Sequence, residues 1–244
     1  MEQVEGFVVL LDISGYTRFV RSHNLRHIPV LGTRFRVTSE AHAEEVVTDL
    51  LETLINATSD LLRPEKLEGD AVLFTAVPEN PSDFAQQLVT KLQTIFAVFQ
   101  DRIHQIAFCS TCLCDCCSQM TQLKVKAIVH HGPFLIKKVA GFREIAGQEI
   151  IRAHRLLKNT IDSDQYLLLT DSVNTLAKAS SIIPIESHQE EDPDLGSTTV
   201  WVHYPELDEI EEKAPTESYL KRYSKMHEFF DQERDRDALI PAAK

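Results

Sequence analysis

Two carboxylates lie next to apolar runs, each at the end of the run that adjoins a predicted turn. Asp12 follows the run 7–11 directly, and Asp70 follows Gly69 immediately before a second run, 71–74. If these runs are neighbouring strands, both carboxylates meet at one edge of a sheet. Paired carboxylates with nearby backbone carbonyl groups form a hard oxygen site, which suits Mg²⁺ and a phosphate-bearing ligand. An aspartate at a turn is also common for conformational reasons alone, so neither residue indicates a site by itself.

The spacing of apolar residues predicts the elements that position these carboxylates. The run 7–11 is typical of a strand, and helical spacing over 38–62 indicates a long amphipathic helix after an irregular segment at 22–37. Residues 69–70 are the predicted turn of a hairpin. A second helical pattern follows at 81–104.

The second half of the chain continues the alternation of strands and helices. Residues 123–129 alternate as a half-buried strand, and we expect a turn at 130–133 with 134–139 as the hairpin partner. A helix over 147–158 and a buried strand over 166–169 follow. The order strand–helix–strand–strand–helix–strand predicts an α/β protein of the α+β type, with a ferredoxin-like βαββαβ core and additional strands and helices. In such a sheet the first and central strands are neighbours, which would bring the two carboxylates together.

The composition excludes some classes of partner. The 244 residues carry 25 Lys and Arg against 37 Asp and Glu, a formal net charge of −12 at pH 7. An acidic chain repels nucleic-acid phosphates, so we expect no nucleic-acid partner. We expect no membrane partner either, because no apolar run approaches the roughly 20 residues of a membrane-spanning helix. The acidic segment Met1–Glu5 does not resemble a signal peptide, so we expect a soluble cytoplasmic protein.

The predicted domain occupies residues 1–205, and the composition changes after it. Residues 206–217 are strongly acidic, which is typical of a solvated linker. Aromatic and apolar residues then recur at helical spacing over 218–237. This pattern predicts an amphipathic helix that packs either on its own domain or on a second copy of the chain.

The five cysteines lie close together, in a Cys-rich insert at 109–121. Two thiolates in a CxxC pair are a common half-site for Zn²⁺. The insert contains two such pairs, formed by Cys109, Cys112, Cys114 and Cys117. Four ligands from nine consecutive residues would be cramped, so a histidine at 130–131 or a second chain is an alternative source of ligands. A redox-responsive thiol cluster and ordinary loop cysteines are the other interpretations.

Four segments resemble, in order, the motifs of class III nucleotidyl cyclases. Residues 7–17 resemble the opening strand with its Asp-Ile-x-Gly-Phe-Thr turn, and Lys66–Ala71 resembles the Lys-x-x-Gly-Asp-Ala hairpin. His131–Pro133 is similar to the turn between the later strands. Residues 143–157 resemble the Tyr-Asp-x-x-Gly stretch and the Val-Asn-x-Ala-x-Arg-Leu helix. The resemblance covers about residues 5–205, and the chain looks like a bacterial cyclase-related branch with a Cys-rich insert.

The resemblance implies a nucleotidyl cyclase, most directly one that converts ATP to cAMP and pyrophosphate. It assigns Asp12, Asp70 and the Ile13 carbonyl group to two divalent ions, Mg²⁺ or Mn²⁺. In the family these ions neutralise the triphosphate and favour deprotonation of the ribose 3′-hydroxyl group, which attacks the α-phosphorus. The resemblance also implies a homodimer, in which one protomer holds the metals while the other contacts the base and supplies an arginine.

The remaining roles fall on side chains of the later motifs. Lys66 and Glu144 match the pair that binds the purine, and a donor beside an acceptor suits adenine. Arg155 matches the arginine that stabilises charge on the transferred phosphoryl group. The family's asparagine, four residues before this arginine, is Ile151 here, and its side chain cannot donate a hydrogen bond. The alternative function is therefore a catalytically impaired homologue that acts as a nucleotide- or metal-binding sensor module.

Overall fold

The computed structural model describes residues 1–21, 32–109, 119–207, 224 and 228. The described residues fall into two compact units. The first contains Met1–Ser14, Thr53–Val98 and Lys124–Leu207, and the second includes Gly15–Glu52 and Phe99–Leu123. Apart from residues 206, 207, 224 and 228, the predicted linker at 206–217 and the predicted helix at 218–237 lie outside the described residues.

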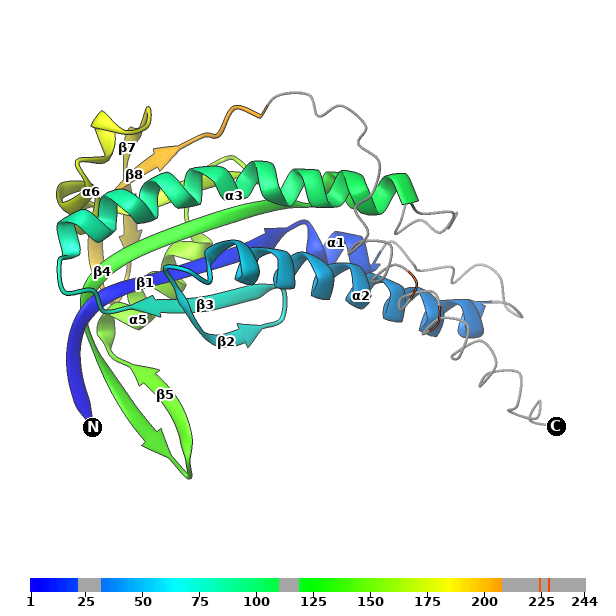
Figure 1. The fold of residues 1–244 in the computed structure, drawn as a ribbon, viewed down its shortest axis with the longest axis horizontal. Coiled ribbons are helices and arrows are strands. Elements are labelled where there is room, and N and C mark those ends of the chain that lie inside the picture. The colour runs from blue at the N-terminus through cyan, green and yellow to red at the C-terminus, as the bar shows by residue number, and fades with distance from the viewer. Residues whose placement is uncertain (22–31, 110–118, 208–223, 225–227, 229–244) are drawn as a thin grey trace. The chain divides into compact units, whose positions relative to one another are not determined.

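Within the described part of the chain, eight strands of the first unit form one sheet (Figure 1). The strands are β1 (Glu2–Ser14), β2 (Arg63–Glu68), β3 (Ala71–Ala76), β4 (Lys124–Val139), β5 (Phe142–Ala146), β6 (Tyr166–Thr170), β7 (Glu186–Asp192) and β8 (Gly196–His203). Their order is β2-β3-β1-β4-β6-β8-β7, with β5 paired to β4 off this path. The antiparallel block β2-β3-β1-β4 is the ferredoxin-like core, so the predicted fold class is confirmed.

The helices differ from their predicted bounds mainly at the ends. They are α1 (Tyr16–Arg21), α2 (Gly32–Thr58), α3 (Pro81–Cys109), α5 (Gln148–Arg155) and α6 (Asp171–Ala177). The predicted irregular segment at 22–37 is wrong for 32–37, which are already helical. The predicted helix end at residue 62 is also wrong, because the amides of Leu61 and Leu62 both bond to the Thr58 carbonyl group and close the helix there. No described helix is long and apolar enough to cross a membrane.

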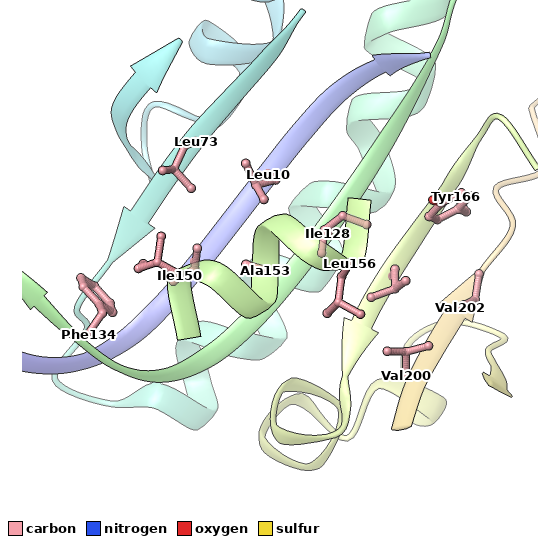
Figure 2. Close-up of a cluster of buried hydrophobic side chains, with 12 residues drawn as sticks. Leu10, Leu73, Ile128, Phe134, Ile150, Ala153, Leu156, Tyr166, Val200 and Val202 are labelled. Carbon is pink, nitrogen blue, oxygen red and sulfur yellow. The ribbon is translucent and has the colours of Figure 1, made fainter. Parts of the chain in front are cut away.

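Strand β1 is buried on both faces, which explains its uninterrupted apolar sequence. Phe7 packs on Phe84 of α3, with ring centroids 5.0 Å apart. Val8 and Leu10 point to the opposite face, since side chains alternate along a strand. There they join a buried cluster beneath α5 (Figure 2), which also contains Leu73, Ile128, Phe134, Ile150, Ala153, Leu156, Tyr166, Leu168, Val200 and Val202. Asp12 lies on this same face, two residues beyond Leu10.

The predicted turn at 130–133, with 134–139 as a hairpin partner, is wrong, because β4 continues straight through it. The hairpin partner is β5, and the two-residue connection consists of Ala140 and Gly141, both with positive φ. Gly132 serves close packing, since a Cβ atom there would lie 3.0 Å from the Glu149 side chain. Pro133 is tolerated because β6 pairs with 126–129 and β5 with 135–139, which leaves one edge of β4 unpaired between them.

Candidate functional site

Asp12 belongs to a row of residues that crosses four strands. It pairs with Ala71 of β3 on one side and with Lys126 of β4 on the other, and Lys126 pairs with Tyr166 of β6. The next row is entirely apolar and lies in the buried cluster of Figure 2: Leu73, Leu10, Ile128, Leu168 and Val202. The row that contains Asp12 and Lys126 therefore borders the hydrophobic core at the end of β1.

The structure brings Asp12 and Asp70 together at this end. The Ile13 amide donates a hydrogen bond to the Asp70 carbonyl group over 3.0 Å, which ties the two motifs to each other. The pKa of Asp12 is raised to about 6, first by burial and then by the charge of Asp70, while Lys126 lowers it. Folding thus holds two carboxylates close to each other in a half-buried place, where a cation would stabilise both charges.

The oxygen donors at this end suit a hard divalent cation. No described residues form a cluster of three or more His, Cys, Asp or Glu side chains able to hold a metal. The Ser14 hydroxyl group lies two residues after Asp12, buried and without a hydrogen-bond partner in the described chain. Mg²⁺ commonly binds through one or two carboxylates together with water and substrate phosphates. The donor set therefore fits Mg²⁺ or Mn²⁺ arriving with a phosphorylated ligand.

Lys126 is a residue of this site that the sequence pattern did not reveal. The prediction of a half-buried strand placed it on a solvent face, but only 20 % of its side chain is exposed. Its ammonium group lies 3.8 Å from Asp164 and 5.5 Å from the centroid of the Tyr166 ring. Both faces of β4 are covered, so alternation could not identify Lys126 as a neighbour of Asp12.

Lys66 and Glu144 lie within electrostatic reach of each other but are not paired. The Lys66 ammonium group lies 3.0 Å from a Glu68 oxygen, and 60 % of the lysine side chain is exposed. A hydrogen bond and an ion pair with Glu68 raise the pKa of Lys66, and the charge of Glu144 adds to this effect. Glu68 also lies 3.4 Å from His154 of α5. Lys66, one of the two predicted base-binding residues, is thus linked through Glu68 to the helix that carries Arg155.

Arg155 is directed away from the Asp12 end of the sheet. Its guanidinium group lies 3.8 Å from Asp192, the last residue of β7, and 3.3 Å from Asp194, in the turn that leads to β8. Among the described residues, none of its ion pairs or hydrogen bonds reaches Asp12 or Asp70. Ile151, one helical turn before Arg155, is 52 % exposed. The structure therefore places the predicted metal ligands and the predicted arginine apart within one chain.

A buried hydrogen-bond chain joins α5 to the sheet, and the sequence did not predict it. The two ring nitrogens of His130 lie 2.8 Å from a Glu149 oxygen and 3.0 Å from the Thr170 hydroxyl group. Arg152 continues the chain, since it donates to Glu149 over 3.0 Å and to Thr198 over 2.8 Å. These contacts fix the position of the helix that carries Ile151 and Arg155. Burial lowers the pKa of His130, although Glu149 opposes this.

We expect His130 to make folding sensitive to pH between 7 and 5.5. In the unfolded chain the imidazole takes up a proton at the ordinary histidine pKa of about 6.5, whereas folded His130 takes it up only at lower pH. The free energy of unfolding therefore falls as the pH decreases, by up to about 1.4 kcal/mol per pH unit for one titrating group. Urea unfolding across this range should give a smaller fall for His130→Gln than for wild type. Asp12, which contributes with opposite sign, is common to both proteins, and equal slopes would contradict the prediction.

The predicted zinc ligands lie almost entirely outside the described residues. Cys109 is the last residue of α3, and only its backbone is described. Cys112, Cys114 and Cys117 lie in the segment 110–118, which is not described. The prediction of a metal at this insert therefore stays a prediction.

Solved structures share this fold. The adenylyl cyclase CyaB from P. aeruginosa matches with a TM-score of 0.59 at 12 % identity, over 88 % of this chain and 100 % of that one. The guanylate cyclase domain of RhGC from Catenaria anguillulae, in complex with GTP, matches with a TM-score of 0.56 at 15 % identity, over 84 % and 100 %. The guanylyl cyclase Cya2 gives 0.53 at 10 % identity, over 82 % and 92 %. The chain thus has the fold of class III nucleotidyl cyclase domains.

The family model and the relative that match this sequence are both described without an activity. A family model described as a protein of unknown function, DUF2652, matches residues 47–166. An uncharacterised protein of Mycobacterium tuberculosis is 34 % identical over 127 residues, which are 52 % of this chain and 58 % of the relative. The chain therefore spans little more than half the length of that relative. The family model includes Lys66, Asp70, Glu144 and Arg155, whereas Asp12 lies before it.

Proposed function

We propose that this protein binds a nucleoside triphosphate, ATP first of all, with Mg²⁺ or Mn²⁺, and converts it to cAMP and pyrophosphate in a homodimer. The observation that carries the proposal is the half-buried pair of Asp12 and Asp70 at the end of β1. The cyclase fold supports it, since similar structures were solved in complex with GTP and with ATPalphaS.

We assign each residue a role according to the charge or hydrogen-bonding groups of its side chain. Asp12, Asp70 and the Ile13 carbonyl group would hold the divalent ions, which supply neutralisation of the triphosphate and favour loss of the 3′-hydroxyl proton. Lys66 and Glu144 would bind the base, and Arg155 would stabilise the charge that builds up on the α-phosphoryl group. The 3′-oxygen then bonds to the α-phosphorus as the bond to pyrophosphate breaks.

A second copy of the chain would complete the site. The Arg155 side chain is 52 % exposed, and the side chain of Asp194, its nearest ion-pair partner, is 74 % exposed. An ion pair at the surface is weak, so Arg155 can turn from it toward another protomer. Apolar side chains on the strands and helix around the base-binding pair are also exposed, as an interface between copies requires. They are Leu67 (60 %), Val139 (52 %), Phe142 (74 %) and Ile151 (52 %).

The second candidate function is a nucleotide- or metal-binding sensor module without appreciable turnover. Ile151 favours it, because an exposed isoleucine offers no hydrogen bond to the ribose or to the developing charge. Loss of one preorganised donor costs about 10²–10³ in rate in other enzymes. Binding through Asp12 and Asp70 does not need this donor.

Purified protein with each of the four nucleoside triphosphates and Mn²⁺ separates these functions. We expect ATP with Mn²⁺ to raise the melting temperature, since a ligand at 100 times its Kd stabilises by about 2.7 kcal/mol. Neither Mn²⁺ alone nor ATP with a chelator should match this rise. Release of pyrophosphate with cAMP supports the enzyme, and stabilisation without release supports the sensor. If no triphosphate stabilises the protein or is turned over, and neither Mn²⁺ nor Zn²⁺ alone stabilises it, both functions are excluded.

A further inference from the structure

Strand β2 carries a buried charge directly beside its exposed lysine. The Glu65 side chain is only 6 % exposed, whereas the neighbouring Lys66 side chain is 60 % exposed. The pairing of β2 with β3 shifts between Pro64 and Lys66, so Glu65 is the extra residue of a β-bulge. A bulge redirects side chains locally, and here it accompanies the burial of a carboxylate.

The Glu65 carboxylate accepts hydrogen bonds from two side chains, those of Arg143 and Thr75. One Arg143 nitrogen, Nη1, lies 2.7 and 2.6 Å from its two oxygens, and the Thr75 hydroxyl group donates to it over 2.6 Å. Arg63 lies 3.7 Å away, but its side chain is 65 % exposed. A buried charge held in this way resists displacement, because separating the pair would leave the carboxylate buried and unpaired. Glu65 and Arg143 therefore form a firm clamp.

The clamp joins two strands that do not pair with each other. Strand β2 is the edge strand beside β3, and β5 pairs with β4. The clamp residues immediately precede the two residues expected to bind the base: Glu65 precedes Lys66, and Arg143 precedes Glu144. The clamp therefore fixes the relative position of the backbones that carry Lys66 and Glu144.

The position of these two side chains decides which purine they fit. Adenine accepts a hydrogen bond at its ring nitrogen N1 and donates one from its exocyclic amine. Guanine presents the reverse order, since it donates from N1 and accepts at its exocyclic oxygen. A lysine beside a carboxylate is complementary to both bases. Discrimination between adenine and guanine then depends on the positions of the Lys66 donor and the Glu144 acceptor, and not on their chemistry alone.

We propose that Glu65 and Arg143 are positioning residues that set the spacing of Lys66 and Glu144, and so determine the preference of the site for adenine over guanine. This inference rests on the proposed nucleotide-binding function. Relaxing the clamp should reduce the ratio of ATP to GTP affinity. Affinity for the triphosphate itself should persist, because the clamp has no described contact with Asp12 or Asp70.

The test measures dissociation constants for ATP, GTP and inorganic tripolyphosphate with Mn²⁺. Arg143→Lys keeps the charge but replaces the planar guanidinium group, whose Nη1 contacts both Glu65 oxygens, and we expect the ATP-to-GTP preference to fall about tenfold. Thr75→Val removes one donor to Glu65 at similar volume and should shift the preference about two- to threefold in the same direction. Arg63→Lys changes an exposed arginine near the same carboxylate and should leave the preference unchanged. Tripolyphosphate affinity should stay within about twofold in all three variants.

Each other result contradicts the inference in a recognisable way. A preference unchanged in both Arg143→Lys and Thr75→Val would overturn the role in specificity. An equal loss of affinity for ATP, GTP and tripolyphosphate would show that the clamp is only structural. Thr75→Val provides the test if Arg143→Lys does not fold. Wild-type protein that binds no nucleoside triphosphate would overturn the proposed function, and this inference with it.

Discussion

Asp12→Asn is expected to abolish turnover, with a loss of at least about 10³-fold, and to remove the stabilisation by ATP with Mn²⁺. The substitution keeps the size of the side chain but removes half of the charge that would attract the ions. The substitution should not destabilise the folded protein, because burial and the nearby charge of Asp70 both disfavour the charged form of Asp12. The melting temperature without ligand should therefore stay the same or rise.

Asp162→Asn is the matched control for this experiment. It makes the same change of charge at a position outside the site, so we expect nucleotide binding and turnover like those of wild type. Pyrophosphate release and thermal unfolding, with and without ATP and Mn²⁺, measure both properties in the same samples. An Asp12→Asn protein that still gains stability from ATP with Mn²⁺ would show that the nucleotide binds elsewhere.

Ile151→Asn is expected to increase turnover about 10²-fold, the effect of one preorganised hydrogen-bond donor. The position lies one helical turn before Arg155, and the resemblance to class III cyclases places an asparagine there. Ile151 is 52 % exposed, so the substitution sacrifices little buried apolar surface and should leave the fold unchanged. The dissociation constant of ATP should change little, because the gain concerns the transition state.

Val77→Asn controls for the loss of an exposed aliphatic side chain, since Val77 is also 52 % exposed. We expect its turnover to equal that of wild type. Single-turnover pyrophosphate release measures the chemical step directly. If Ile151→Asn binds ATP but remains as slow as wild type, the asparagine position is not what limits the rate, and the sensor module becomes the better description.

The order of elements was predictable because it depends on local periodicity. Apolar runs and helical spacing predicted the ferredoxin-like core, and that core placed the strands carrying Asp12 and Asp70 side by side. The same local reasoning failed at 130–133. Gly132 and Pro133 have the composition of a turn, but Gly132 makes room for Glu149, and Pro133 occupies a stretch of β4 with one unpaired edge.

Residues whose contacts depend on strand register and on burial were not predicted from the sequence. Lys126 meets Asp12 only because of the pairing between β1 and β4, which a single sequence does not reveal. Glu65 and Arg143 have the appearance of surface charges until the structure shows one of them almost fully buried. His130 was expected in a turn, yet it lies inside a strand beneath α5. In each case the decisive contact joins residues far apart in the chain.

The pairing of β1 also has a consequence for biosynthesis. This strand hydrogen-bonds to β3 and β4, and β4 begins at Lys124, about 110 residues after β1 ends. At ribosomal rates of about 5–20 residues per second, the apolar run of β1 waits roughly 5–20 s before its last neighbour has been made. During this interval the edge of β1 that pairs with β4 is open, and an apolar strand with an open edge is prone to aggregation. The strand expected to carry the metal ligands is thus synthesised well before β4, the last of its two partner strands.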